Sequence, residues 1–325
     1  MKPRSLIAAG LVLLASCGGT TPGADGPRTV TLLAYDAFTP PEGIFDSFTE
    51  RTGIAVEVVT GGDSGSVISK AILTAGNPEG DVLWGVDDTT LSRVDEADVL
   101  DSRALVSEGD VCVNYDKAWY ADKGVAPPTS LDDLVKPAYR GQLVVQDPVN
   151  SSPGLAFLMA SIARYGDAWT DWWRLLVAND VTIVSDWTTA YTSEFSGSSG
   201  KGRHPLVVSY GSSPPAEIVY AATPIEEPPT AVIESTCFRQ VEYAGVLRGA
   251  DDADAAQQVL DFLVGVEFQE SMPLSLFVFP VNPDAALPEV FEKWAVRPRS
   301  PLTIPPAEIQ TNRDSWLETW RTIAL

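Results

Sequence analysis

The stretch Val181-Thr-Ile-Val-Ser-Asp-Trp-Thr-Thr-Ala-Tyr191 indicates how this chain folds and where it binds a ligand. Residues 181–184 are mostly apolar and β-branched, which is typical of a short buried strand. Ser185 or Asp186 then offers a helix N-cap, and Trp187 falls in the first helical turn. Ligands of open α/β sheets collect at the carboxyl ends of strands, so we expect a site at Asp186 and Trp187. A carboxylate beside an indole suits a flat cation, because the acid offers charge and the ring offers a face. The alternative is that Asp186 only caps the helix and Trp187 only packs.

Strands and helices alternate on both sides of this stretch. Strands are predicted at residues 29–34, 54–59, 81–85, 111–115, 143–146, 206–210 and 238–247. Helices are predicted at residues 41–52, around 67–72, from 155 onward, around 169–176, at 255–266 and at 307–323. This alternation predicts an α/β fold with mostly parallel sheets. It occurs twice, so we expect two lobes, with residues 238–247 returning the chain to the first.

The first residues predict export and a lipid anchor. Lys2 and Arg4 precede an apolar run over residues 6–14, which is typical of a signal peptide and too short to span a bilayer. Leu14-Ala-Ser-Cys17 resembles a bacterial lipobox. We therefore expect residues 1–17 to be a lipoprotein signal peptide, with Cys17 lipidated and the protein held extracytoplasmically on the cell membrane. Residues 18–28, rich in Gly, Thr, Pro and Asp, predict a flexible tether.

The charge of the chain excludes one class of partner. Its 325 residues include 44 acidic and 22 basic side chains, for a net charge of −22. Removing residues 1–17 takes away two basic residues and no acid, so the charge becomes −24. A nucleic-acid partner is not expected, because neutralising phosphates needs a basic surface.

Two cysteines remain once Cys17 is assigned to lipid. Cys112 and Cys237 are an even number in an exported chain, so a disulfide between them is expected, near the crossings between the lobes. Two separate buried thiols are the alternative.

No catalytic motif is supported. Gly62-Asp-Ser-Gly65 is similar to the nucleophile loop of chymotrypsin-like proteases, but His204 is the only histidine and lies far downstream in a basic, glycine-rich loop. Residues 197–202 lack the spacing of a phosphate-binding loop. One histidine and no cysteine pair at ligand spacing argue against zinc. We expect no enzyme activity, no metal and no cofactor.

Several motifs, in order, resemble a known family: the substrate-binding lipoproteins of ABC importers and, within it, thiamine-binding proteins. The motifs are Ala34-Tyr-Asp-Ala-Phe38, Gly80-Asp-Val-Leu-Trp-Gly-Val-Asp-Asp88, Gln146-Asp-Pro with Ser152-Pro-Gly-Leu155, Ser185-Asp-Trp-Thr-Thr-Ala-Tyr191, Val208-Ser-Tyr-Gly-Ser-Ser-Pro214 and Phe279-Pro-Val281. Together they span nearly the whole mature chain.

The resemblance implies a two-lobed, periplasmic-binding-protein-like (type 2) fold with crossing hinge strands. The lobes would be residues 29–114 plus 243–290 and residues 115–242 plus 291–325. It implies thiamine or a thiamine phosphate as the ligand and an ABC permease as the partner of a monomer. The alternatives are a ferric ion or another small cation, and, from another class, a surface-anchored hydrolase.

The resemblance also implies a set of ligand-binding residues. They are Tyr35, Asp36, Asp63, Ser64, Gly65, Ser151, Ser152, Asp186, Trp187, Tyr210, Gly211, Ser212, Ser213 and Phe277. Two family aromatics are replaced, a tyrosine by Ala216 and a tryptophan by Phe277.

The chemistry of these residues fits a cation independently of the resemblance. Trp187 and Tyr210 are candidates to stack on the thiazolium or aminopyrimidine ring, at about 0.5–2 kcal/mol per cation–π contact. Asp36, Asp63 and Asp186 are candidates for the counter-charge. Ser152 begins a helix with a proline at its start, so free N–H groups are expected to face the cleft. The alternative for Ser152 is an ordinary N-cap.

Overall fold

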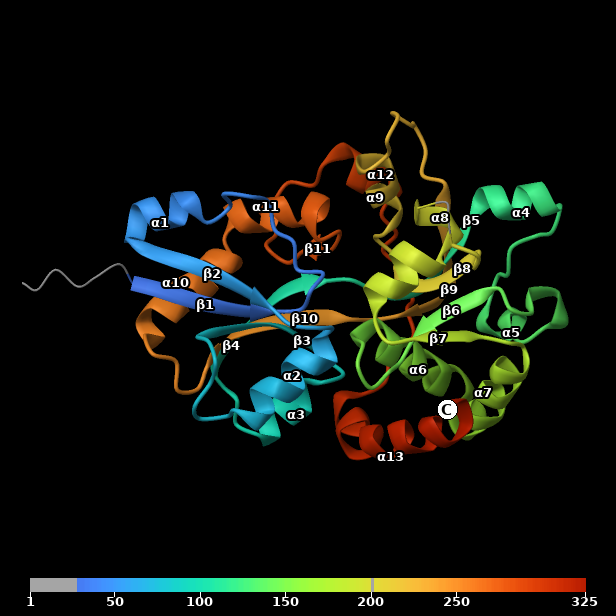
Figure 1. Cartoon of the computed structure of the whole chain (residues 1–325), viewed down its shortest axis with the longest axis horizontal. Helices are drawn as coiled ribbons and strands as arrows, with labels where there is room; N and C mark the ends of the chain where they lie inside the picture. Colours follow the sequence, from blue (N-terminus) through green and yellow to red (C-terminus); the bar gives the residue numbers. More distant parts are fainter. Residues whose placement is uncertain (1–27, 200–201) are drawn as a thin grey trace, which may run out of the picture.

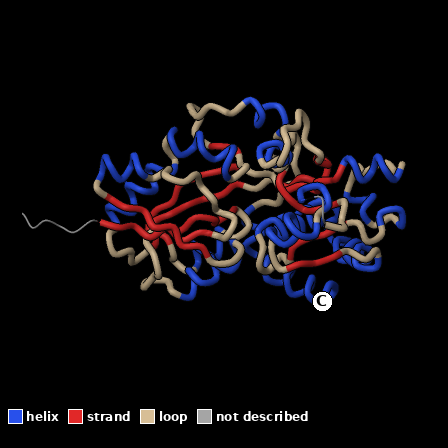
Figure 2. The backbone as a smooth tube through the Cα atoms, turned by 45° about the horizontal axis from the view of Figure 1, so that its top comes forward, coloured by secondary structure: helices blue, strands red, loops and turns tan. Residues whose placement is uncertain are grey.

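The computed structural model describes residues 28–199 and 202–325 and consists of two α/β lobes, side by side along the longest axis (Figure 1). The predicted signal peptide, the lipidation site Cys17 and nearly all of the predicted tether lie outside the described residues. Figure 2 shows the strands as two separate groups, one in each lobe, with helices around them.

The first lobe is built on a mixed sheet of six strands. In spatial order they are β11 (Phe279–Pro280), β4 (Leu100–Glu108), β10 (Val241–Leu247), β3 (Val82–Asp87), β1 (Arg28–Ala34) and β2 (Ile54–Thr60). Strand β1 is parallel to β2 and β3, whereas β10 is antiparallel to β3 and β4. All six residues of β3 are buried, as expected for a central strand that is covered on both faces.

Helices cover both faces of this first sheet. On one face α1 (Asp46–Thr52), α10 (Ala253–Leu263) and α11 (Val266–Ser275) enclose a core that includes Phe48, Trp84 and Phe268. On the other face α2 (Ser64–Leu73) and α3 (Leu91–Glu96) pack Ile68 and Val94 against the sheet.

The second lobe has a mixed sheet of five strands. In spatial order they are β7 (Thr182–Val184), β6 (Leu143–Gln146), β8 (Leu206–Tyr210), β5 (Val111–Asp116) and β9 (Thr230–Phe238). The sheets are mixed rather than mostly parallel, because the strands next to the crossings run against their neighbours.

The core of the second lobe is rich in tryptophan. It lies between the sheet and α6 (Ser152–Tyr165), α7 (Trp169–Ala178) and α13 (Pro306–Ala324). Trp173 meets Phe157 and Trp320 edge to face, which is a favoured aromatic geometry, so the predicted aromatic stripe is core. The remaining short helices are α4 (Lys117–Lys123), α5 (Leu131–Leu134), η1 (Pro137–Tyr139), η2 (Gly166–Ala168), η3 (Thr189–Glu194), α8 (Ser196–Ser199), α9 (Pro214–Val219) and α12 (Glu289–Trp294).

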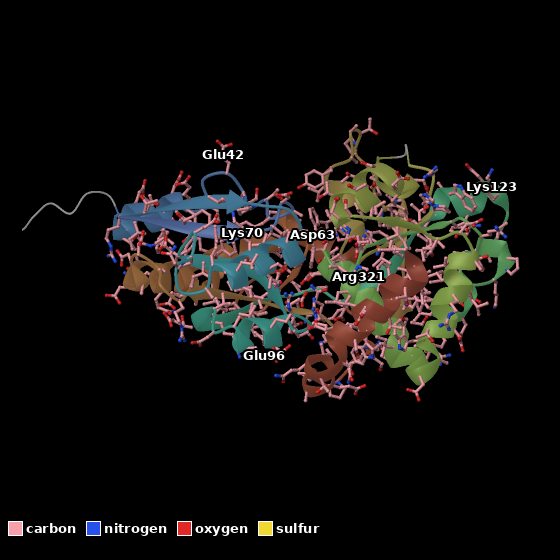
Figure 3. The ribbon with its side chains drawn as sticks, turned by 60° about the horizontal axis from the view of Figure 1, so that its bottom comes forward. Glu42, Asp63, Lys70, Glu96, Lys123 and Arg321 are labelled. Atoms are coloured by element: carbon pink, nitrogen blue, oxygen red, sulfur yellow. A yellow bond between two sulfur atoms is a disulfide. The ribbon has the colours of Figure 1, made fainter. Side chains whose placement is uncertain are left out.

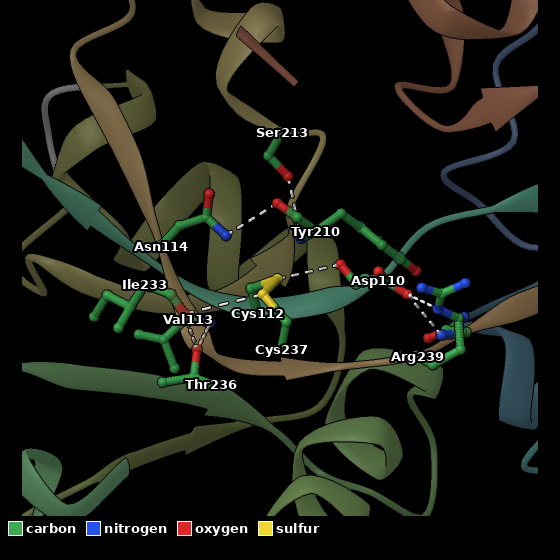
Figure 4. Close-up of a disulfide and its surroundings, with 11 residues drawn as sticks. Asp110, Cys112, Val113, Asn114, Tyr210, Ser213, Ile233, Thr236, Cys237 and Arg239 are labelled. Atoms are coloured by element: carbon green, nitrogen blue, oxygen red, sulfur yellow. Dashed lines mark hydrogen bonds and ion pairs between the residues drawn. A yellow bond between two sulfur atoms is a disulfide. The ribbon is translucent and has the colours of Figure 1, made fainter. Parts of the chain in front are cut away.

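The sheets are joined by short crossings that carry the predicted disulfide. The chain changes sheets between β4 and β5 and again between β9 and β10, and after β11 it returns to the second lobe, where α13 packs. Cys112 and Cys237 are bonded across β5 and β9, which confirms the predicted pair (Figure 4). Beside them, Asp110 and Arg239 form an ion pair of 2.7 Å between the first two crossings. The predicted lobe limits remain a prediction.

Two predicted strands need correction. Residues 238–247 are not one strand, because β9 ends at Phe238 and β10 begins at Val241. Cys237 lies near the end of β9. The strand in Val181–Tyr191 is present as β7, but it is the half-buried edge of its sheet rather than a buried strand. Within the described residues, no helix is long and apolar enough to cross a membrane.

Candidate ligand-binding site

A cavity of about 470 Å³ lies between the lobes, within the usual size range of small-molecule sites. Its walls come mainly from loops and short helical segments at the junction between the lobes, where Figure 3 places Asp63. Its lining residues are Tyr35, Asp36, Ala37, Thr39, Asp63, Ser64, Ser152, Pro153, Trp187, Thr188, Tyr191, Thr192, Ser198, Tyr210, Ser213, Ala216, Glu217, Tyr220, Glu242, Ser275, Leu276, Phe277 and Val278.

Trp187 forms one wall, as its place after β7 predicts. Its indole stacks on Tyr191 with ring centroids 5.0 Å apart and planes at 14°, and its Nε1–H donates to Ser209 Oγ at 3.0 Å. The two residues are four apart in a helical turn, so the stack follows from their spacing. One indole face is thus occupied by Tyr191, and the ring is held in a fixed orientation at the cavity.

Asp63 connects the two lobes. It is the N-cap of α2, where its Oδ1 accepts from the Ser64 amide at 2.8 Å. Its Oδ2 accepts from the Trp187 amide at 3.1 Å, across the cleft. Burial raises the pKa of Asp63, although the hydrogen bonds to these amides act in the opposite direction.

Three further contacts join the lobes at or just before the start of α6. The Ser152 hydroxyl donates to Asp87, and the Ser152 amide donates to Ser64 Oγ at 3.2 Å. The Gly65 amide donates to the Asn150 carbonyl at 3.0 Å. The expectation that the Ser152 amide is free is therefore wrong, since a hydroxyl of the other lobe accepts its hydrogen bond.

A buried acid, Glu242, forms part of the cavity wall beside Tyr35. The Tyr35 hydroxyl donates to Glu242 Oε2 at 3.3 Å, and the Ser107 hydroxyl donates to the same oxygen at 3.2 Å. Trp84 Nε1–H donates to the Tyr35 hydroxyl at 3.4 Å. Burial, reinforced by the charge of Asp87, raises the pKa of Glu242 to about 8.

A second acid, Glu217, lies on α9 in the other lobe. Its Oε1 accepts a hydrogen bond of 2.7 Å from the Tyr191 hydroxyl, and burial raises its pKa. Nearby, Tyr220 lies four residues after Ala216 and contacts Phe277 edge to face, with ring centroids 5.6 Å apart. This contact puts a ring of α9's lobe against a ring of the first lobe.

The structure brings most of the predicted site residues to the cavity. Nine of the fourteen line it: Tyr35, Asp36, Asp63, Ser64, Ser152, Trp187, Tyr210, Ser213 and Phe277. Gly65, Ser151, Asp186, Gly211 and Ser212 do not. Ser212 nevertheless joins the lobes, because its hydroxyl donates to the Phe277 carbonyl at 2.6 Å.

Asp186 is placed differently from the prediction. Its oxygens accept from the amide and hydroxyl of Thr189 and from the Ser185 hydroxyl, so it caps the helical turn. It lines a neighbouring hollow that also contains Asn150 and Ser66. The capping alternative holds for Asp186, whereas Trp187 does line the cavity.

Sequence reasoning missed Tyr191, Glu217, Tyr220 and Glu242. A signal existed for Tyr191, which follows Trp187 by one helical turn. Glu217 follows Ala216 on the short helix α9, and Tyr220 is the C-cap of that helix. Nothing marks Glu242 among 44 acids, since its burial depends on how β10 packs.

The histidine of the chain lies away from the protease-like loop. Ser64 Oγ contacts Asp63 and the Ser152 amide. The His204 ring is buried in the other lobe, where Nδ1 meets the Gly141 carbonyl at 3.1 Å. Within the part of the chain that the structure describes, no group of three or more His, Cys, Asp or Glu could hold a metal ion.

Comparison with known proteins identifies similar molecules. The sequence profile described as "bacterial extracellular solute-binding protein" matches residues 26–270. A thiamine-binding periplasmic protein of Salmonella typhimurium is 28% identical over 316 residues, covering 90% of this chain and 92% of the relative. A solved periplasmic thiamin binding protein aligns with a TM-score of 0.82 at 25% identity, over 97% of this chain and 100% of that one. An iron-bound protein of Pseudomonas aeruginosa aligns with a TM-score of 0.71 at 20% identity, over 92% of this chain and 100% of that one.

Proposed function

This chain belongs to the family of bacterial extracellular solute-binding proteins, and we propose that the solute it captures is thiamine or a thiamine phosphate. The proposal includes delivery of that solute to the permease of an ABC importer. The thiamine-binding relatives support it, because their similarity extends over nearly the whole of both chains.

The observation that carries the proposal is the composition of the cavity wall. Four carboxyl groups line it, those of Asp36, Asp63, Glu217 and Glu242, and none of the described lining residues is Lys, Arg or His. The same wall contains the rings of Tyr35, Trp187, Tyr191, Tyr210, Tyr220 and Phe277. Acids and ring faces together suit a flat cation, and thiamine carries a permanently positive thiazolium and a flat aminopyrimidine.

The cavity wall contains more aromatic rings than the predicted set of site residues, because Tyr191 and Tyr220 also line it. Ala216 and Phe277 stand where the family has a tyrosine and a tryptophan. Tyr220, one helical turn after Ala216, also lines the cavity and touches Phe277. We propose that Tyr220 replaces the ring missing at Ala216.

The ferric alternative has less support. The iron-bound relative is less similar than the thiamin-binding one in both fold and sequence.

Membership of the family places the protein outside the cytoplasm. We further propose that Cys17 carries the lipid that anchors it, because Leu14-Ala-Ser-Cys17 follows an apolar run behind a basic start. Mass spectrometry of the membrane-extracted protein tests this: a diacylglyceryl mass on a chain that begins at Cys17 is expected, and an unmodified cysteine contradicts it.

Native mass spectrometry of the protein, purified without added ligand, tests the assignment of the solute. We expect a population heavier by one thiamine or one thiamine phosphate, and conversion of the remainder when thiamine is added. The Trp187→Ala variant should retain less of this ligand. A co-purified iron, or no adduct at any thiamine concentration, contradicts the assignment.

A further inference from the structure

Glu242 occupies an unusual position for an acid. It lies at the start of β10, two residues after the second crossing between the lobes, and only 7% of its surface is exposed. It nevertheless lines the cavity. Its Oε2 accepts the hydroxyls of Tyr35 and Ser107, so its partners are neutral donors.

The charged and titratable groups around Glu242 come from several elements. Asp87 at the end of β3 acts on it as a like charge, and Ser107 of β4 donates to it. The hydroxyls of Tyr35, after β1, and Tyr210, at the end of β8, also face it. Together with the Trp84 indole, these groups supply hydrogen bonds or negative charge, and none of them is a cation.

We propose that Glu242 is the counter-charge that the cavity provides for the ligand's cation, and that Glu242 releases its proton when the cation enters. This role rests on the proposed function. The step breaks only the carboxylic O–H bond, and the proton passes to the buffer. The permanent charge of the ligand then takes the place of the proton beside the carboxylate, so a charge is not left unpaired in a buried site.

The sign of the pH dependence follows from the unliganded state. With a pKa of about 8, roughly nine tenths of Glu242 is protonated at pH 7. A cation within contact distance lowers the pKa of a carboxyl by about 1 to 3 units. Binding therefore releases about 0.4 to 0.9 proton at pH 7 and almost none at pH 9.5. Because binding of the cation is coupled to loss of the Glu242 proton, the affinity of the protein for the cation rises about 7- to 70-fold from pH 6 to pH 8.5.

Calorimetric titration with thiamine in buffers of different ionisation enthalpy counts the released protons. The wild-type protein should release about 0.4 to 0.9 proton at pH 7 and nearly none at pH 9.5. Glu242→Gln keeps the shape and one oxygen acceptor but has no proton to lose. This variant should bind thiamine with little proton release and with an affinity that varies far less with pH.

Glu217→Gln is the matched control, since Glu217 is the other glutamate of the wall and burial raises its pKa as well. It should weaken binding while keeping most of the proton release. Wild-type binding without proton release at pH 7 overturns the role of Glu242, as does undiminished release by Glu242→Gln. If that variant does not fold, the wild-type proton count is compared with the counts of Glu217→Gln and Asp63→Asn, and a release that both of these variants lose overturns the role of Glu242. Absence of any thiamine binding by the wild type contradicts the proposed function instead, and this role falls with it.

Discussion

The main-chain amide of Trp187 donates a hydrogen bond of 3.1 Å to Oδ2 of Asp63, which joins the second lobe to the first. The residue whose ring forms one wall of the cavity therefore also links the two lobes through its backbone. Because Asp63 also caps α2, the same side chain serves both the link between the lobes and the helix end.

Replacing Trp187 by alanine tests the role of its ring. We expect binding of thiamine to weaken by about 2–4 kcal/mol, since the variant loses a ring face and a cation–π contact. The half-buried position of Trp187 predicts a smaller effect on the stability of the unliganded protein. Calorimetry and thermal unfolding on the same samples separate the two effects.

Trp173→Ala is the control for this experiment, because Trp173 is a core residue with 1% exposure. It should lower the free energy of unfolding by about 3–5 kcal/mol and leave the affinity of the folded fraction unchanged. The binding role of Trp187 is contradicted if Trp187→Ala behaves like Trp173→Ala.

Asp63→Ala tests the coupling between closure and the helix cap. The variant loses the acceptor for both amides, so α2 should lose about 1 kcal/mol of capping energy and the lobes should open. Small-angle scattering of the unliganded protein should show a larger radius of gyration, together with weaker thiamine binding. Asp63→Asn keeps one oxygen acceptor and should change scattering less. Identical scattering curves for Asp63→Ala and wild type would contradict the link.

The disulfide between Cys112 and Cys237 should stabilise the second lobe next to the crossings. It closes a loop with a sequence separation of 125. Constraining a loop of this length in the unfolded chain contributes about 4–5 kcal/mol in the chain-entropy description. The Cys112→Ser/Cys237→Ser variant should unfold at correspondingly lower denaturant concentration. Two alkylatable thiols in the non-reduced mature protein would show that the bridge does not form.

Tyr220→Ala tests whether this residue replaces the family ring missing at Ala216. The variant removes the ring that meets Phe277 across the cleft, and we expect an affinity loss of about 1–2 kcal/mol. Tyr220 is 70% exposed, so thermal stability should hardly change. Tyr220→Phe keeps the ring and should bind like wild type. Equal affinity of Tyr220→Ala and wild type would remove Tyr220 from the site.

The sequence predicted those parts of the fold that depend on local pattern. Strands β1, β2, β5, β6 and β8 and the C-terminal helix α13 lie close to where periodicity placed them. Strands β4 and β9 were missed, because neither has the unbroken apolar run or the strict alternation that marks a strand: β4 reads Leu-Asp-Ser-Arg-Ala-Leu-Val-Ser-Glu, and β9 has three polar residues, Glu234-Ser-Thr236, in its middle. The sequence does not show where β9 ends and β10 begins, since Arg239 and Gln240 do not interrupt an extended pattern. These two residues lie outside both strands because the chain crosses between the lobes there.

The candidate site shows the same division. Trp187 was found because a ring after a strand has a local signature. Asp186 has that signature as well, but its oxygens bind Thr189 and not the cavity. Glu242 has no local signature, since its burial arises from β3, β4 and the loop after β1 packing around β10.

Calorimetric titration of the purified mature protein with thiamine at neutral pH tests the central claim most directly. The account predicts saturable binding of one thiamine per chain, with a change in tryptophan fluorescence that is lost in Trp187→Ala. Absence of binding heat with thiamine and with its phosphates, at micromolar protein, would contradict it.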